Sequence, residues 1–199
     1  MLPLIPKRFA SKTLHNLENY DAEIEEAMRA ITHGIGVCLI GPCGSGKTHF
    51  ATGLFKEVVK RRVRVNDEGE LDYRMCLGCR WASAYDFLFD LKKAMGTEIS
   101  DDAIISQWTM PEVLLLDEIG VENVSDWSRF MMYALINERY IQERFTIITS
   151  NLSLDHLAER IDDRIGSRIN EMCHVMTLKG TGESGDHRLQ LIAERKLKM

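Results

Sequence analysis

The stretch "LIGPCGSGKTHF", residues 39–50, decides what kind of protein this 199-residue chain forms. An apolar run at 37–40 leads into a loop with glycines at 41, 44 and 46, and a helical pattern follows. The loop matches G-x-x-x-x-G-K-T in full, between a strand-like and a helix-like segment. In such a loop, successive backbone N–H groups converge on a phosphate, and the following helix adds the positive end of its dipole. The stretch therefore predicts a phosphate-binding loop, and a chance glycine-rich turn is the weaker interpretation.

The predicted loop implies that the chain binds ATP or ADP together with Mg2+. Lys47 adds a full positive charge toward the β- and γ-phosphates, and the Thr48 hydroxyl is a ligand for Mg2+. We expect the nucleotide contacts to come from consecutive residues of the loop and of the helix start: Gly41, Pro42, Cys43, Gly44, Ser45, Gly46, Lys47, Thr48 and His49.

Two adjacent acids, Asp117 and Glu118, end the apolar run "VLLLDE". A run of this kind is typical of a strand buried on both faces of a parallel sheet, and it delivers its last side chains to the edge where such sheets bind ligands. We expect Asp117 to hold Mg2+ through water and Glu118 to act as the general base on the attacking water. Taken alone, an apolar run that ends in two acids is a common strand exit, so this interpretation depends on the loop.

A second polar strand end is Asn151, in "TIITSNLS". Its amide can hydrogen-bond a γ-phosphate or the lytic water, which would make it a catalytic sensor. The alternative is that Asn151 only forms a turn.

Arg164 and Arg168, in "DRIGSRI", are four residues apart and project from one face of a continuous helix. Arginine suits the charge that develops on a transferring phosphoryl group, and a neighbouring subunit can supply it. We favour Arg168 as this arginine finger. The alternative is a solvated pair that binds nearby acids, namely Asp162, Asp163 or Glu171.

Strand-like and helix-like segments alternate along the chain, which predicts a doubly wound α/β sheet. We expect helices at 21–33, 49–62, 84–95, 101–108 and 126–145, and a helical stretch at 154–172 that is interrupted at Gly166. We expect strands at 37–40, 80–82, 113–116, 146–150 and 174–180, and an exposed hairpin or loop at 65–74. Ser83 is the expected N-cap of the third helix.

Composition limits the class of protein. The net charge of -5 argues against a uniformly basic nucleic-acid-coating surface, so any DNA contact must be local. No apolar run approaches the roughly 18 residues of a membrane span, and the opening "MLPLIPKRFA" does not have the order of a secretory signal. Five cysteines, an odd number, suggest reduced thiols in a cytoplasmic protein without disulfides.

The motifs taken together resemble the AAA+ ATPases. More narrowly, "GPCGSGKTHFATGL", "LLLDEIG", "INERY" followed by "TIITSNL", and "RIDDRIGSRI" resemble the family of DnaC and DnaI helicase loaders and IstB transposition ATPases. The resemblance extends over nearly the whole chain. His49, directly after Lys47 and Thr48, separates this group from generic P-loop proteins.

The resemblance implies a P-loop NTPase of AAA+ type, with a five-stranded parallel sheet and helices on both faces. It implies assembly into rings or spirals on ATP, with Arg168 donated in trans and Arg164 beside it. Thr48 and Asp117 would serve magnesium, Glu118 hydrolysis and Asn151 the first sensor. The partners implied are further copies of the chain, a replicative helicase or a transposase, and single- or double-stranded DNA, with no membrane.

The function expected from this resemblance is ATP hydrolysis by a DNA-replication protein of the helicase-loader type. An IstB-like transposition regulator is one alternative. Another is a binding or inhibitor subunit that uses ATP as a switch with little turnover. A small-molecule kinase shares the loop, but the other motifs do not suggest an acceptor-binding lid.

We divide the chain into a basic lead-in at 1–20, an AAA+ core at 21–188 and a basic tail at 189–199. Relatives usually carry an additional N-terminal domain that grips a partner, whereas here the loop begins at Gly41, which suggests a reduced loader. Arg188 is a candidate second sensor. The tail residues Leu189, Ile192 and Leu197 suggest a short amphipathic helix that docks on the core or on another protein.

Two further signals are weaker. Cys76 and Cys79 have the spacing of half a zinc site or of a redox pair. The only plausible completion of a zinc site is Cys173 with His174, whose side chains would point to opposite faces of a strand. Lys92 and Lys93 are candidate DNA contacts because initiator-type relatives often face the channel with this region, although charge runs are usually solvated surface.

Overall fold

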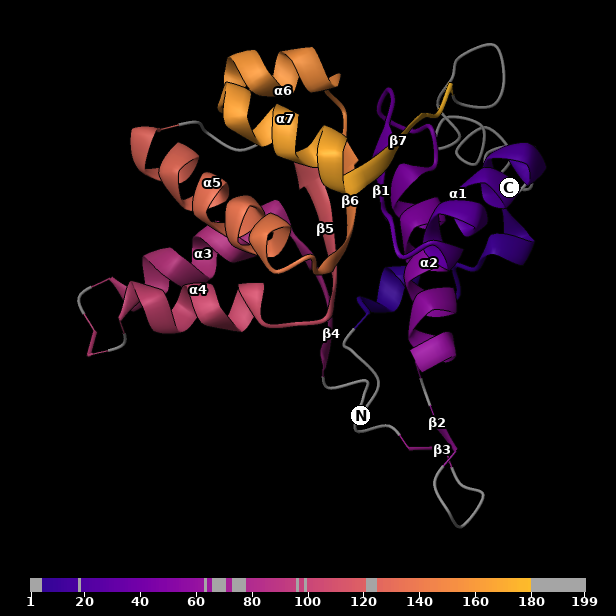
Figure 1. Cartoon of the computed structure of the whole chain (residues 1–199), viewed down its shortest axis with the longest axis horizontal. Helices are drawn as coiled ribbons and strands as arrows, with labels where there is room; N and C mark the ends of the chain where they lie inside the picture. The colour runs from indigo at the N-terminus through magenta and orange to yellow at the C-terminus, as the bar shows by residue number, and fades with distance from the viewer. Residues whose placement is uncertain are drawn as a thin grey trace, which may run out of the picture.

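The protein is built on a five-stranded parallel sheet, as the sequence predicts (Figure 1). The structure is a computed structural model, and it describes residues 5–17, 19–62, 64–65, 71–72, 78–95, 97–98, 100–120 and 125–179. The strands are β1 (Gly36–Ile40), β4 (Cys79–Ser83), β5 (Val113–Ile119), β6 (Phe145–Ser150) and β7 (Cys173–Thr177). Their order across the sheet is β4-β5-β6-β1-β7, so β6 lies between the strand that enters the glycine loop and the strand that carries the two acids.

Helices cover both faces of the sheet, and each face has its own hydrophobic core. On one face pack α1 (Asp21–Thr32) and α2 (Lys47–Arg62). On the other lie α3 (Ala84–Ala94), α4 (Asp101–Thr109), α5 (Asp126–Ile141), α6 (Leu154–Arg160) and α7 (Asp163–Met172). Successive strand residues alternate between the two cores: Val37 and Leu39 face the first, and Cys38 and Ile40 the second. This explains why the strands are continuous apolar runs rather than alternating patterns.

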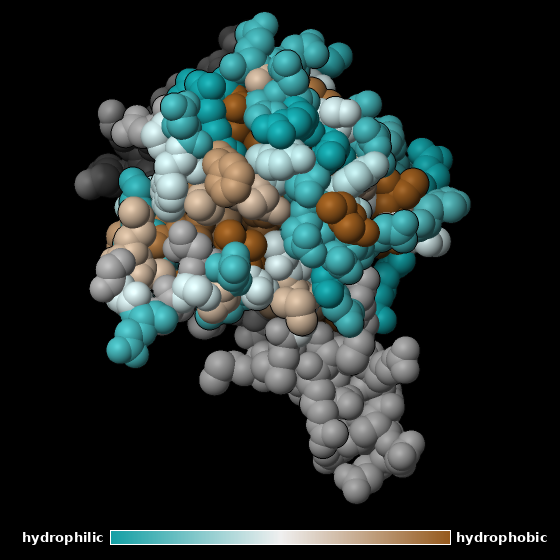
Figure 2. Space-filling model, turned by 60° about the vertical axis from the view of Figure 1, so that its left-hand side comes forward, coloured by the Kyte–Doolittle hydropathy of each residue, from teal (hydrophilic) through white to brown (hydrophobic). Residues whose placement is uncertain are grey.

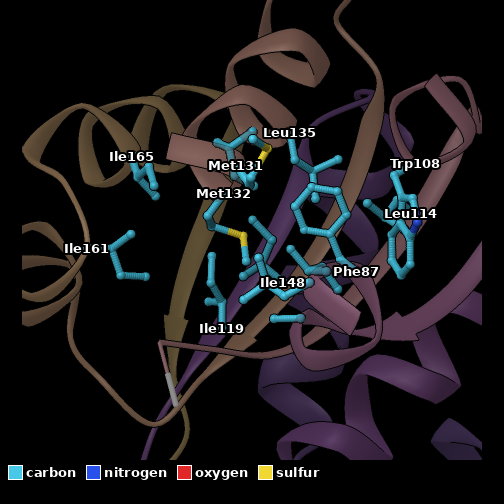
Figure 3. Close-up of a cluster of buried hydrophobic side chains, with 14 of the residues drawn as sticks. Phe87, Trp108, Leu114, Ile119, Met131, Met132, Leu135, Ile148, Ile161 and Ile165 are labelled. Atoms are coloured by element: carbon cyan, nitrogen blue, oxygen red, sulfur yellow. The ribbon is translucent and has the colours of Figure 1, made fainter. Parts of the chain in front are cut away.

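Figure 3 shows the larger core, on the side of α3, α5 and α7. Phe87 and Trp108 meet edge to face, with ring centroids 5.2 Å apart, and join α3 to α4. Met131 and Leu135 of α5 and Ile165 of α7 point into the same cluster. These contacts fix α5 and α7 against the sheet and against each other.

The expected helix break at Gly166 is wrong. The break lies between α6 and α7, where the Asp162 side chain accepts a hydrogen bond of 2.8 Å from the N–H of Arg164 and begins α7. Gly166 is buried inside α7, and a Cβ there would lie 3.2 Å from the Cβ of Ala158 in α6. Gly166 therefore allows α6 and α7 to pack closely, and it does not end a helix.

Most other sequence expectations for the fold agree with the structure, but the helix expected at 126–145 ends at Ile141, because the chain turns at Glu143, whose φ is +50°, and Phe145 begins β6. The Ser83 hydroxyl caps α3 by accepting a hydrogen bond from the N–H of Asp86. The segment expected as a hairpin or loop contains β2 (Arg64–Val65) and β3 (Leu71–Asp72), which pair antiparallel. Arg188 and the tail at 189–199 lie outside the described residues.

The N-terminal lead-in packs on the core along α2. It contains the short helices η1 (Lys7–Phe9) and η2 (Leu14–Asn16). Phe9 stacks on Trp81 at 5.5 Å, and the Lys56 ammonium donates to the carbonyls of Ala10 and Lys12, at 2.6 Å each. The segment from 5 to 17 is therefore attached to the helix that follows the glycine loop.

No helix in the described part of the chain is both long enough and apolar enough to cross a membrane.

Candidate functional site

The glycine loop connects β1 to α2 at the carboxyl edge of the sheet. Gly44 and Gly46 have φ angles of +82° and +83°, which are the left-handed conformation that glycine adopts without a steric penalty. The Tyr20 hydroxyl donates to the carbonyl of Ser45 at 2.8 Å, so the lead-in supports the loop from outside. The segment "GPCGSGKT" therefore forms the turn that the pattern requires between a strand, β1, and a helix, α2.

The Lys47 ammonium lies inside the loop. It donates to the carbonyl oxygens of Gly41 and Pro42, at 2.8 and 2.7 Å, and it is buried. A buried ammonium surrounded by carbonyl dipoles is positioned to exchange these weak acceptors for phosphate oxygens, which bind it more strongly. The side chain thus provides the positive charge that the motif predicts, at the base of the loop.

Thr48 and Asp117 meet at this edge although they are 69 residues apart in the sequence. The Thr48 hydroxyl is 3.0 and 3.2 Å from the two carboxylate oxygens of Asp117. Hydroxyl and carboxylate oxygens are the ligands that Mg2+ prefers. The pair therefore fits a magnesium ion whose remaining ligands are water and nucleotide oxygens, with Thr48 and Asp117 as the residues that would hold it.

A third residue, Thr149 of β6, links the two acids. Its hydroxyl donates to Asp117 Oδ1 at 2.7 Å and accepts from the N–H of Glu118 at 2.8 Å. Thr149 is fully buried. One hydroxyl therefore fixes the side chain of Asp117 and the backbone of Glu118 at the same time.

The two acids occupy an irregularity in β5. Leu116 pairs with Ile148 and Ile119 with Ser150, so Asp117 and Glu118 together oppose the single residue Thr149. This is the arrangement of a β-bulge, which re-aims side chains next to active sites. Asp117 is buried and faces Thr48, whereas Glu118 is exposed to solvent.

The backbone of Glu118 is strained, with φ of +60°. A side chain other than glycine in this region costs about 1 to 2 kcal/mol. The cost is offset by the hydrogen bond from the Glu118 N–H to Thr149 and by the buried neighbours Leu116 and Ile119. The strain coincides with the residue that the sequence assigns as general base.

Burial raises the pKa of the Asp117 carboxyl. Hydrogen bonds from Thr149 and Thr48 oppose this shift, and the charge of Glu118 adds to it. The ionised form of Asp117 is therefore costly in the protein alone, and a bound cation would stabilise it.

Asn151 directly follows β6 and is exposed at the same edge of the sheet, one residue beyond the buried Ser150. The Ser150 hydroxyl donates to the carbonyl of Ile119 at 2.8 Å and accepts from the N–H of Leu152 at 3.0 Å. These bonds hold the turn that presents Asn151 beside the exit of β5.

The two arginines lie on α7, against α5. Arg164 forms a bidentate pair with Asp162, at 2.9 and 2.8 Å, which is the partner that the solvated-pair interpretation names. Arg168 instead donates through Nε to Asn137 of α5 at 2.6 Å and is half-buried. The structure thus separates two residues that the sequence treats as a pair.

The ring of His49 faces the lead-in. Its Nε2 lies 3.0 Å from the Thr13 carbonyl and 2.8 Å from Asn16 Oδ1. Both partners are acceptors, so this nitrogen carries a hydrogen. The side chain of His49 ties η2 to the first turn of α2, and a contact of this residue with the nucleotide stays a prediction.

Thr149 is the site residue that sequence reasoning missed. The signal available was a pair of adjacent hydroxyl residues, Thr149 and Ser150, at the end of a mostly apolar strand that also holds Thr146. Buried hydroxyls need partners, so such a pair indicates a polar network at the strand end. The sequence does not reveal that this network reaches Asp117, because the connection depends on the register of β5 against β6.

The cysteines do not support the zinc alternative. Cys76 lies outside the described residues, and Cys79 and Cys173 lie on β4 and β7, the two opposite edges of the sheet. Across four strand spacings they are about 19 Å apart. Within the described residues, no group of three or more His, Cys, Asp and Glu could hold a metal ion.

A family model described as IstB-like ATP binding protein matches residues 26–190 of the chain. Among known proteins, the phage-like element PBSX protein XkdC of Bacillus subtilis (strain 168) is 26% identical over 162 residues, which are 77% of this chain and 54% of the relative. The replicative helicase loader DnaC of Escherichia coli (strain K12) is 21% identical over 165 residues, 77% of this chain and 62% of the relative. The chain thus spans less than two thirds of the length of either.

Among solved structures, a crystal structure of the DnaC helicase loader superimposes with a TM-score of 0.69 and 27% identity, and the match covers 87% of this chain and 100% of that chain.

Proposed function

The chain belongs to the family of IstB-like ATP-binding proteins, and from this premise we propose that it hydrolyses ATP as an AAA+ protein of the helicase-loader type. The observation that carries the proposal is the Thr149 hydroxyl, which joins Asp117 and Glu118 beside Thr48. A protein that only binds a nucleotide needs the loop and the magnesium ligands. It does not need a strained acid held next to them.

The proposed chemistry is attack of water on the γ-phosphate. Lys47 and the loop N–H groups bind the phosphates, and Thr48 and Asp117 would hold Mg2+, which would neutralise charge on the phosphates. Glu118 accepts the proton of the attacking water, and Asn151 orients that water or the γ-phosphate. Catalysis of this kind acts mostly through positioning and charge stabilisation.

The proposal includes assembly on ATP. Arg164 and Arg168 lie on α7, which packs along α5 (Figure 1). Of the two, Arg168 is the residue proposed to reach the nucleotide of an adjacent copy. A ring or spiral of copies then completes each site with an arginine from its neighbour.

The proposed partners are DNA and a replicative helicase. Lys92 and Lys93 are exposed on α3, and Lys93 lies 4.6 Å from the ring of Phe89. A cation beside an exposed aromatic ring fits a single strand, whose bases stack while its phosphates meet the charge. The helicase comes from the similarity to DnaC, which is named a helicase loader.

A transposition regulator is the second candidate, because the matching family model is IstB-like. Its ATPase core would be the same and its partner would be a transposase. The third candidate, an ATP-switched binding subunit, predicts assembly without turnover.

Light scattering and phosphate release on the same samples test the proposal. We expect ATP with Mg2+ to shift the wild type to an oligomer, ADP not to do so, and turnover per subunit to rise with protein concentration. Glu118→Gln should assemble without turnover. Assembly of the wild type without phosphate release would instead favour the switch. Pull-downs with a replicative helicase and with a transposase then separate the first two candidates.

A further inference from the structure

Arg168 is held by a row of side chains on α5 that no motif in the sequence assigns to the nucleotide site. Tyr133, Asn137 and Tyr140 have i, i+4, i+7 spacing, so they form one stripe along α5. Each of them is half-buried. The opposite side of the helix points into the core through Met132, Leu135 and Ile136.

The stripe contacts both arginines of α7 in different ways. The Arg164 guanidinium lies 4.1 Å from the centre of the Tyr133 ring and is neutralised by its bidentate pair with Asp162. The Arg168 guanidinium lies 5.0 Å from the Tyr140 ring and 5.8 Å from the Tyr133 ring. Its hydrogen bond is to the neutral amide of Asn137, through Nε.

This difference determines which arginine can serve an anion. A guanidinium binds phosphate best with its terminal nitrogens, because two parallel N–H groups match two oxygens. In Arg164 one terminal nitrogen and Nε are occupied by a carboxylate. In Arg168, Nε donates to Asn137, and the neighbouring ring of Tyr140 limits the rotation of the guanidinium group. The hydrogen bond from Tyr140 lowers the pKa of the Glu171 carboxyl, and Arg168 lies close enough for its charge to add to this shift. The hydrogen bond that fixes the direction of the Arg168 fork is nevertheless the one to Asn137.

The backbone beneath Arg168 is rigid. Ile165 and Ile169 of α7 are fully buried in the core, and Gly166 brings α6 into close contact. Glu171 accepts from the Tyr140 hydroxyl at 2.6 Å and from Ser167 at 3.2 Å, which ties the end of α7 to the stripe. A half-exposed amide–arginine bond adds little to an interface that is already fixed by apolar packing.

We infer that Asn137 is a positioning residue that orients the Arg168 fork toward the nucleotide of an adjacent copy, with Tyr140 limiting its rotation. The inference rests on the proposed function, because it needs an ATPase whose finger acts in trans. Asn137 does not touch the nucleotide. It acts through Arg168, and its loss should leave ATP binding intact while it lowers turnover in the neighbouring subunit.

A mixing experiment with full-length chains isolates this effect. The acceptor is Arg168→Ala, whose own site is intact. The donor is Glu118→Gln, which is inactive at its own site but keeps Arg168. Neither should turn over alone, and a mixture of the two should recover turnover at acceptor sites that face a donor.

Asn137→Ala is then added to one partner at a time. In the donor, we expect it to lower the recovered kcat by about 10- to 100-fold with little change in KM, since misplacing a catalytic group by about 1 Å can cost two orders of magnitude. In the acceptor, the same change should have no effect, because that subunit has no Arg168 to orient. Donor Asn137→Asp should also lower recovery, because a carboxylate would neutralise the fork. Donor Glu138→Ala, on the same helix beside Asn137, is the matched control and should recover fully.

Equal loss from Asn137→Ala in donor and acceptor would overturn the inference, because it would show a role in folding or assembly. Full recovery with donor Asn137→Ala would overturn it as well. If the wild type hydrolyses ATP but the mixture recovers nothing, Arg168 is not donated between copies, and the inference fails while the ATPase proposal stands. If the wild type does not hydrolyse ATP, both fail.

Discussion

Replacing Thr149 by valine removes the hydroxyl that joins the two acids and preserves the shape of the side chain. Two interactions are lost: the hydrogen bond to Asp117 Oδ1 at 2.7 Å and the bond from the Glu118 N–H at 2.8 Å. A bond to a charged group contributes about 1.5 to 3 kcal/mol, and a buried N–H left without a partner costs about 1 to 3 kcal/mol. Since the two share one hydroxyl and are not additive, we expect a loss of about 3 kcal/mol in the free energy of unfolding.

The expected fall in Tm follows from the size of the domain. One kcal/mol corresponds to about 2 to 4 °C for a chain of this size, so Thr149→Val should lower Tm by about 6 to 12 °C. The pKa of Asp117 should rise further, because Thr149 is one of the groups that lower it. Turnover should fall by about 10- to 100-fold, since both acids lose their common support.

Thr149→Ser is the matched control, because it keeps the hydroxyl and removes one buried methyl group, at a cost of about 1 kcal/mol. Differential scanning calorimetry gives the stability, and phosphate release at saturating ATP gives the turnover. Equal Tm values and equal turnover for Thr149→Val and Thr149→Ser would show that the hydroxyl does not support the two acids.

Three further predictions concern Glu118, Gly53 and Asp117. Because the φ of Glu118 is +60°, Glu118→Gly should melt about 2 to 8 °C above Glu118→Ala, both being inactive; equal Tm values would argue against backbone strain there. A Cβ on Gly53 would lie 2.8 Å from the N of Leu14, so Gly53→Ala should release the segment 5–17 and speed tryptic cleavage within it, and unchanged cleavage would contradict the packing. Burial raises the pKa of Asp117 above its ordinary value of 3.8. At a pH between these two pKa values the folded protein binds more protons than the unfolded chain, so the free energy of unfolding falls as pH increases through this range. In EDTA, Asp117→Asn should therefore melt above the wild type at pH 7 to 8, with the gap closing toward pH 4; a gap that does not depend on pH would contradict this.

The sequence predicts the sheet, its helices and the glycine loop because each depends on local patterns. Apolar runs, caps such as Ser83 and the loop glycines act within a few residues of where they occur. The contact between Thr48 and Asp117 was also predictable, because both residues end strands or begin helices at the same edge of a parallel sheet.

The remaining features depend on how distant segments are aligned. The bulge that sets Asp117 and Glu118 against Thr149 is a property of strand register, which the sequence of either strand leaves open. The choice of Asn137 for Arg168 depends on the rotation of α5 against α7. Gly166 reads as a helix breaker because its reason, the neighbouring Ala158, belongs to another helix.

Whether this site hydrolyses ATP is decided by phosphate release from the wild type and from Glu118→Gln, with ATP binding measured on the same samples. We expect both proteins to bind ATP with Mg2+ equally well, and the wild type to release phosphate at least about 100-fold faster than the variant. Equal binding together with equally low phosphate release would contradict this expectation, because the site would then bind ATP without hydrolysing it.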